Sequence, residues 1–153
     1  MKRVLVLASV AILVAGCAHP LRGQGRHDRK VAESDRPKNV AGGVTFQVND
    51  AYDNSYDIAL NYLKRGGHTI DSADKDVGQI ITAIEITGGY SQTGTRIQVT
   101  LIKDSDTQTS VRVAVTKQKR KKALQAEPWS DPKVDDAEST TVADALKMAI
   151  QSK

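Results

Sequence analysis

Apolar and polar residues alternate in several short stretches of the chain, beginning near Val44. This period of two is typical of strands that have one face buried and the other in water. The pattern predicts strands over residues 44–48, 79–87, 96–102 and 111–116, and a further strand that starts at 68–71. Turns and loops are predicted between them, over the Gly-, Asp-, Ser- or Thr-rich segments 72–78, 88–94 and 103–107.

Two other segments place apolar residues every three or four positions, which is the period of an amphipathic helix. The first helix is predicted to follow an N-cap at Asn49 or Asp50 and to end before Gly66-Gly67. Its apolar stripe consists of Tyr52, Tyr56, Ala59, Leu60 and Leu63. The second helix carries Val142, Leu146, Ala149 and Ile150, after a cap at Ser139, Thr140 or Thr141.

The order of elements is therefore β-α-β-β-β-β-α, which predicts the α+β class. We expect an antiparallel sheet of four to five strands, because alternating strands with one polar face form sheets of this kind. Both helices are expected to pack on the apolar face of that sheet. Residues 44–153, about 110 in number, suffice for one small domain.

The N-terminus has a different pattern. Residues 4–15 are all apolar or small and follow the cationic Met1-Lys2-Arg3, which is the layout of a signal peptide. The next residues, Val14-Ala15-Gly16-Cys17, resemble the lipobox of bacterial lipoprotein precursors. The resemblance implies cleavage after Gly16 and acyl chains such as palmitate on Cys17, which would anchor the chain to a membrane. Ala18, where such lipoproteins carry Asp for retention in the inner membrane, implies the outer membrane.

The stretch between this signal and the first strand lacks apolar periodicity. It is rich in Gly, Pro and charged side chains, as flexible linkers are. The predicted organisation is a signal peptide over 1–16, a lipidated cysteine with a tether over 17–43, and a single domain over 44–153. Removal of the signal also removes Lys2 and Arg3, so the formal charge falls from +4 to +2.

Within the predicted domain, Gly66-Gly67-His68-Thr69-Ile70 is followed by Asp74 and then by Gly78-Gln79-Ile80. A helix that ends at glycine, a departing strand and an Asp-to-Gly turn into a long strand recur in envelope lipoprotein domains. Over residues 51 to about 117 the chain resembles the repeated domain of the BamC lipoprotein family, which has a helix-grip fold. The resemblance implies a fold and a compartment, and it carries no catalytic residue over to this chain.

No pattern in the sequence predicts catalysis. His68 is the one histidine of the predicted domain, and the chain has no Gly-x-Ser-x-Gly motif. Turn chemistry explains the aspartates within 71–76 and 104–106, since no Glu closes a calcium loop there. We predict a protein that is not an enzyme and that holds no metal and no cofactor, with a hydrolase based on His68 as the weakest alternative.

The densest basic run follows the last predicted strand, and the only tryptophan lies close behind it. Together they form the candidate partner-binding site, which consists of Lys119, Arg120, Lys121, Lys122 and Trp129. The run suits phosphorylated lipids, acidic glycans or an acidic protein. No aromatic residues interleave with its charges, so nucleic acid is not an expected partner. The alternatives are a solvated basic end that protects an edge strand, and a tryptophan folded over the core.

These features predict a non-catalytic lipoprotein of the cell envelope, held to the outer membrane by Cys17 and facing the periplasm. Its role would be that of a membrane-anchored binding or scaffold module for an envelope complex. The expected partners are the membrane, through the acyl chains, and an envelope protein. The alternative function is a carrier that holds a small hydrophobic ligand or lipid between its helices and its sheet.

Overall fold

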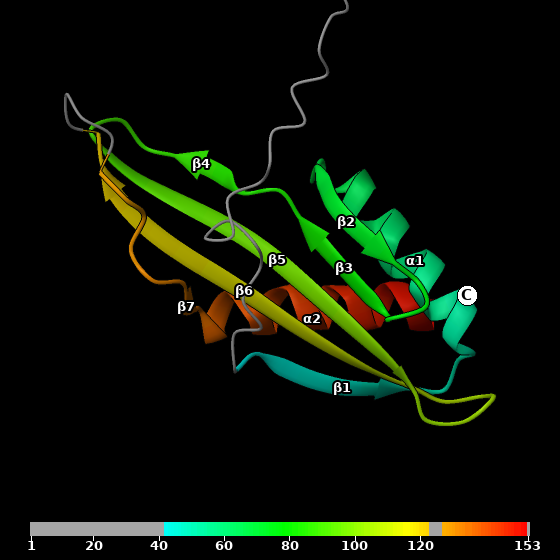
Figure 1. Cartoon of the computed structure of the whole chain (residues 1–153). Coiled ribbons are helices and arrows are strands. Elements are labelled where there is room, and N and C mark those ends of the chain that lie inside the picture. Colours follow the sequence, from blue (N-terminus) through cyan, green and yellow to red (C-terminus); the bar gives the residue numbers. More distant parts are fainter. Residues whose placement is uncertain (1–41, 123–126, 153) are drawn as a thin grey trace, which may run out of the picture. The chain divides into compact units, whose positions relative to one another are not determined.

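One antiparallel sheet and two helices make up the computed structural model of the chain (Figure 1). The structure describes residues 42–122 and 127–152. The predicted signal peptide, Cys17 and nearly all of the predicted tether lie outside these residues. The elements are β1 (Val44–Val48), α1 (Tyr52–Arg65), β2 (Ile70–Asp74), β3 (Gln79–Thr82), β4 (Glu85–Thr87), β5 (Ser91–Lys103), β6 (Thr109–Lys121), β7 (Lys133–Val134) and α2 (Asp136–Gln151).

The centre of the sheet is a long ribbon made by β5 and β6. Their pairing runs without interruption from Lys103 opposite Thr109 to Ser91 opposite Lys121. The strand order is β1-β6-β5-β3-β2, with β4 beside β5 and β7 beside β6. β3 and β4 therefore follow one another along the outer edge of β5, and β1 and β7 follow one another along the outer edge of β6.

The predicted α+β class with an antiparallel sheet and two helices is confirmed, but the prediction of four to five strands is wrong, because the sheet has seven. The apolar run 79–87 is divided at Ala83 and Ile84 into β3 and β4, which pair with different parts of β5. β7 has only 2 residues, too few to show a periodicity. β5 and β6 also exceed their predicted lengths, because polar residues at their far ends pair beyond the apolar core.

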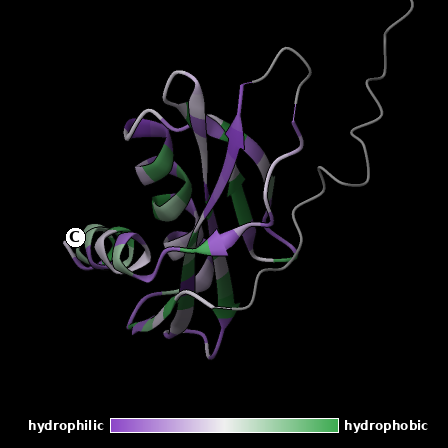
Figure 2. Cartoon of the chain, turned by 90° about the vertical axis from the view of Figure 1, so that its left-hand side faces the viewer, coloured by the Kyte–Doolittle hydropathy of each residue, from purple (hydrophilic) through white to green (hydrophobic). Residues whose placement is uncertain are grey.

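Both helices pack on one face of the sheet, and Figure 2 shows them on the same side of the strands. Leu63 of α1 and Leu146 of α2 are 0% exposed at this interface. They belong to a core with sheet residues Val48, Ile80, Ile97, Val99, Leu101, Val111, Val113 and Val115. Burial of each such side chain contributes about 1.5–3 kcal/mol, so this layer holds the β5–β6 ribbon firmly against the helices.

The start of α2 lies earlier than predicted, and the expected caps at 139–141 are inside the helix. Asp135 is the N-cap, and its Oδ1 accepts a hydrogen bond from the backbone N–H of Glu138 at 3.0 Å. Ser139 is buried; its hydroxyl donates to the carbonyl of Asp135 at 2.7 Å and accepts from the N–H of Val115 at 2.9 Å. These bonds fix the first turn of α2 against β6.

The predicted caps of α1 are also wrong, whereas its predicted stop is confirmed. Ala51 is the N-cap and makes no side-chain capping bond. Asp50 instead accepts hydrogen bonds from the side-chain amide of Asn54 at 2.7 Å. At the other end Gly67 has a φ of +85°, the left-handed conformation for which glycine is favoured after a helix.

Candidate partner-binding surface

The end of the ribbon where β5 begins and β6 stops lies opposite the turn that joins the two strands (Figure 1). Here the N–H of Lys122 donates to the carbonyl of Tyr90 at 2.7 Å, and Lys121 pairs with Ser91. We call Tyr90, Ser91, Lys119, Lys121 and Lys122 the ribbon tip. The tip contains three of the five predicted partner-binding residues.

Strand alternation sorts the basic side chains of β6 between two faces of the sheet. Val115 faces the helices as part of the core, so Lys117, Lys119 and Lys121 share that face. Arg120 lies on the opposite face. The basic run is therefore not a single cluster.

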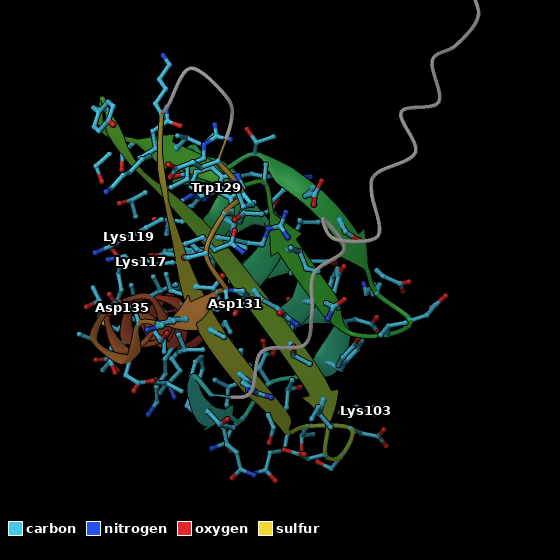
Figure 3. The ribbon with its side chains drawn as sticks, turned by 60° about the vertical axis from the view of Figure 1, so that its left-hand side comes forward. Lys103, Lys117, Lys119, Trp129, Asp131 and Asp135 are labelled. Carbon is cyan, nitrogen blue, oxygen red and sulfur yellow. The ribbon has the colours of Figure 1, made fainter. Side chains whose placement is uncertain are left out.

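Lys117 fastens β6 to α2. Its Nζ lies 3.0 Å from Asp135 Oδ2 and 3.0 Å from Glu138 Oε2. The hydrogen bond to Asp135 and then that to Glu138 raise the pKa of Lys117. The pKa of Asp135 is lowered, first by the backbone N–H of Glu138 and next by Lys117. Figure 3 shows Lys117 between Lys119 and Asp135, at the point where the ribbon passes the helix.

The lysines of the ribbon tip have no such partners. Lys119, Lys121 and Lys122 are exposed, and no carboxylate of residues 42–122 and 127–152 forms an ion pair with any of them. Lys119 and Lys121 stand on one face about 7 Å apart, a distance at which two charges in water repel by roughly 0.5 kcal/mol. Stability of the fold therefore does not account for these charges.

The alternative in which the basic run protects an exposed strand edge does not apply to the first part of the run. β6 has β5 on one side, and β1 and then β7 on the other. Beyond β7, the N–H of Ser130 donates to the carbonyl of Lys119 at 2.9 Å, and the N–H of Lys119 donates to Ser130 Oγ at 2.9 Å. β6 is thus an interior strand as far as Lys119.

Arg120 and Trp129, which the sequence placed in one site, contact each other on the face away from the helices. Arg120 Cζ lies 4.3 Å from the centre of the Trp129 ring, and its Nε donates to Gln92 Oε1 at 2.8 Å. A Cβ atom added to Gly94 would lie 3.2 Å from two ring carbons of Trp129 and 2.8 Å from Ile84 Cγ2. The indole therefore packs on the backbone of β5 at Gly94 and is partly buried.

Two exposed side chains near the tip were not among the predicted site residues. Tyr90 is 70% exposed in the turn between β4 and β5, and Ile86 of β4 is 51% exposed. The sequence contains a signal only for Tyr90, which follows Gly88-Gly89 in a predicted loop. Ile86 belongs to an apolar run, and nothing in the run distinguishes an exposed isoleucine from a buried one.

His68 lies apart from this surface. Its Nδ1 is 2.5 Å from Glu85 Oε1, and the His68 side chain is 27% exposed. Within the described residues no hydroxyl group forms a hydrogen bond with its ring. The contact joins the segment after α1 to β4.

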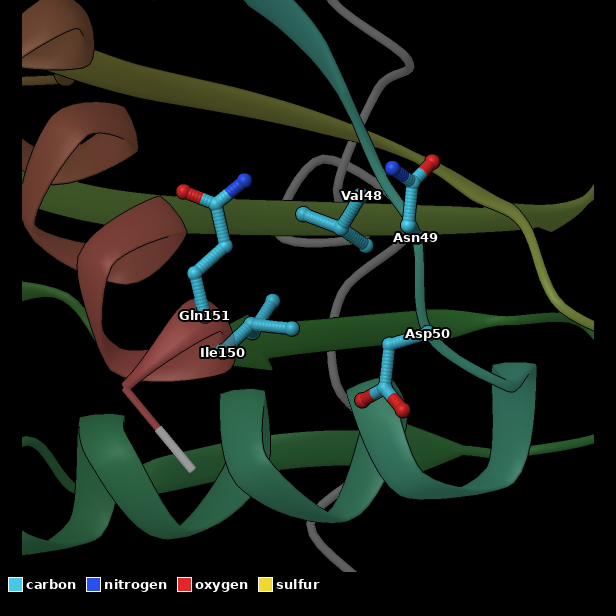
Figure 4. A pocket seen from close by; sticks show the side chains of 5 residues that line it. All are labelled: Val48, Asn49, Asp50, Ile150 and Gln151. Carbon is cyan, nitrogen blue, oxygen red and sulfur yellow. The ribbon is translucent and has the colours of Figure 1, made fainter.

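A small open depression lies at the other end of α2 (Figure 4). It has a volume of about 360 Å³ and is lined by Val48, Asn49, Asp50, Ile150 and Gln151. Three of these side chains are polar, and Val48 and Ile150 belong to the core.

In the part of the chain that the structure describes, no three His, Cys, Asp or Glu side chains are grouped as a metal site would require. No helix among the same residues is long and apolar enough to cross a membrane. No protein-family model matches the chain, and no curated protein matches it in sequence.

Proposed function

We propose that this chain is a non-catalytic, lipid-anchored lipoprotein of the cell envelope that serves as a binding or scaffold module. It would engage its partner through the ribbon tip. The observation that carries the proposal is the set of lysines at Lys119, Lys121 and Lys122, which are exposed and lack ion-pair partners within the described residues. Two of these lysines lie in the paired strand β6, and the backbone N–H of Lys122 donates to the carbonyl of Tyr90 in the turn before β5.

The proposed anchor rests on the lipobox-like sequence. Acyl chains on Cys17 would hold the protein to the outer membrane, with the domain facing the periplasm. Cys17 is the only cysteine of the chain, so it is the only thiol that a diacylglycerol transferase can modify. We expect Cys17→Ser to abolish incorporation of labelled palmitate and to shift the protein from the membrane fraction to the soluble fraction. Full labelling of the variant would contradict the proposal.

The binding part is tested by photocrosslinking in intact cells. A photoreactive amino acid at position 121 should give a discrete adduct, whereas the same residue at position 106, in the turn at the opposite end of the ribbon, should not. The adduct should disappear in Lys119→Glu/Lys122→Glu. A matched control is Lys64→Glu/Arg65→Glu, which makes the same charge change on exposed residues at the end of α1.

The alternative function, carriage of a small hydrophobic ligand between helices and sheet, has less support. Leu63, Val99 and Leu146 are 0% exposed and occupy that layer themselves. The depression at the end of α2 is open, and three of its five lining side chains are polar. Native mass spectrometry of protein purified from the envelope would favour the carrier if it showed a bound lipid or other small hydrophobic molecule.

A further inference from the structure

We infer that the ribbon tip docks on an anionic phospholipid surface. This inference rests on the proposed function and names the partner of the same surface. It follows from the kind of cation that has no ion pair at the tip within the described residues, from the exposed tyrosine opposite Lys122, and from the distribution of charge along the whole ribbon.

The free cations of the tip are all lysines. The one arginine of the run, Arg120, is bonded to Gln92 and stacked on Trp129. Protein–protein interfaces are enriched in Arg and depleted in Lys. One reason is that fixed carboxylates are recognised best by a planar, bidentate guanidinium. Arg120 contacts Trp129 and Gln92, so the exposed cations of the tip are lysines, which are flexible point charges. Such charges suit a diffuse layer of headgroup phosphates better than the fixed carboxylates of a protein.

The residue opposite Lys122 is of a type found at membrane interfaces. Tyr90 is 70% exposed, and its carbonyl accepts a hydrogen bond from the N–H of Lys122, so Tyr90 lies opposite Lys122 at the end of the ribbon. Tyrosine is enriched at the level of lipid headgroups, where its ring is in the apolar boundary and its hydroxyl is in water.

The opposite end of the ribbon is acidic. Its exposed carboxylates are Asp53, Asp57, Asp74, Asp76, Asp104 and Asp106. Lys75 and Lys103 at that end are paired, Lys75 with Asp53 and Asp57 at 3.1 and 3.3 Å and Lys103 with Asp106 at 2.7 Å. Strands of 13 residues separate the two ends by about 40 Å, several times the screening length of physiological salt. A negatively charged surface would therefore attract the tip and repel the other end, which orients the domain.

The test is flotation with vesicles. The full chain carrying Cys17→Ser is mixed with vesicles of phosphatidylcholine alone, or with vesicles that also contain about one third phosphatidylglycerol. Every variant retains the apolar residues 4–15, so their contribution to binding is the same in all of them. We expect preferential binding to the anionic vesicles, weakened by 0.5 M salt. Each lysine near such a surface contributes roughly fivefold in affinity, so Lys121→Gln/Lys122→Gln should lose about 25-fold. Lys64→Gln/Arg65→Gln removes the same charge and should lose far less.

Thermal unfolding of both variants checks that they are folded, since exposed lysines without partners can be replaced with little effect on stability. Equal binding to both kinds of vesicle, or equal losses in the two variants, would overturn the inference. If vesicle binding fails while position 121 still crosslinks to a protein, the binding function stands and the partner is an acidic protein. If both fail, the proposed function falls as well.

Discussion

At the residue scale, Gly94 determines how Trp129 is held. Because Gly94 has no side chain, the indole and Ile84 approach the backbone of β5, and Arg120 covers the ring. The pair that looked from sequence like part of a basic binding run therefore also fastens the segment after β6 to the sheet. Arg120 and Trp129 therefore have a structural role, and the lysines of the ribbon tip are the better candidates for partner binding.

Gly94→Ala tests this packing. The new methyl group would lie 2.8 Å from Ile84 Cγ2, so the surrounding side chains must shift, and we expect a loss of about 1–3 kcal/mol in the free energy of unfolding. Gly89→Ala is the matched control, because no atom lies within 4 Å of a Cβ there and the change should stay within about 0.5 kcal/mol. Urea unfolding measures both. Equal effects would show that Trp129 and Ile84 are not packed on Gly94.

The individual residues of the site could be predicted only in part. The basic run and the single tryptophan are visible in the sequence, but the contact between Arg120 and Trp129 depends on how the segment before β7 returns to the sheet. The pairing of Lys117 with Asp135 and Glu138 likewise depends on where α2 packs. Charge alone does not distinguish Lys117, which is paired, from Lys119, which is free.

At the element scale, periodicity predicted α1 and the cores of β1, β5 and β6 well, because their apolar faces are buried continuously against the helices. Periodicity failed to predict strand residues that are held by backbone pairing and are not buried in the core. The outer halves of β5 and β6 are polar and pair with each other, and β4 is exposed throughout. It also failed at helix starts, since several adjacent polar residues can serve as a cap and the backbone geometry selects Asp135.

The stability contributed by the contact between α2 and β6 should depend on pH. The pKa of Asp135 is lowered in the folded state, so its stabilising effect is complete above the unfolded-state pKa of about 3.9 and is lost as the pH falls through the lower folded-state value. Asp135→Asn keeps a capping side chain but cannot pair with Lys117. We expect its Tm to lie below that of the wild type at pH 6, with the gap closing toward pH 3. A constant gap in thermal unfolding would contradict the assigned ion pair.

At the scale of the whole molecule, the formal charge of +4 conceals a separation of charge along the ribbon. Lysines that have no ion pair within the described residues lie at one end, and aspartates lie at the other, where Lys75 and Lys103 are paired with them. Composition could not predict this separation, because it arises from the antiparallel pairing of β5 and β6. The proposed orientation on a membrane is a consequence of that pairing.

The most direct test of the account compares crosslinks from the two ends of the ribbon in intact cells. A photoreactive side chain at position 121 is predicted to capture a defined lipid or protein, and one at position 106 is predicted to capture neither. Reversal of the charges at Lys119 and Lys122 should remove the adduct, whereas reversal at Lys64 and Arg65 should leave it. Adducts of equal yield from both ends, or an adduct at position 121 that survives the loss of the neighbouring lysines, would contradict the assignment of the ribbon tip as the binding surface.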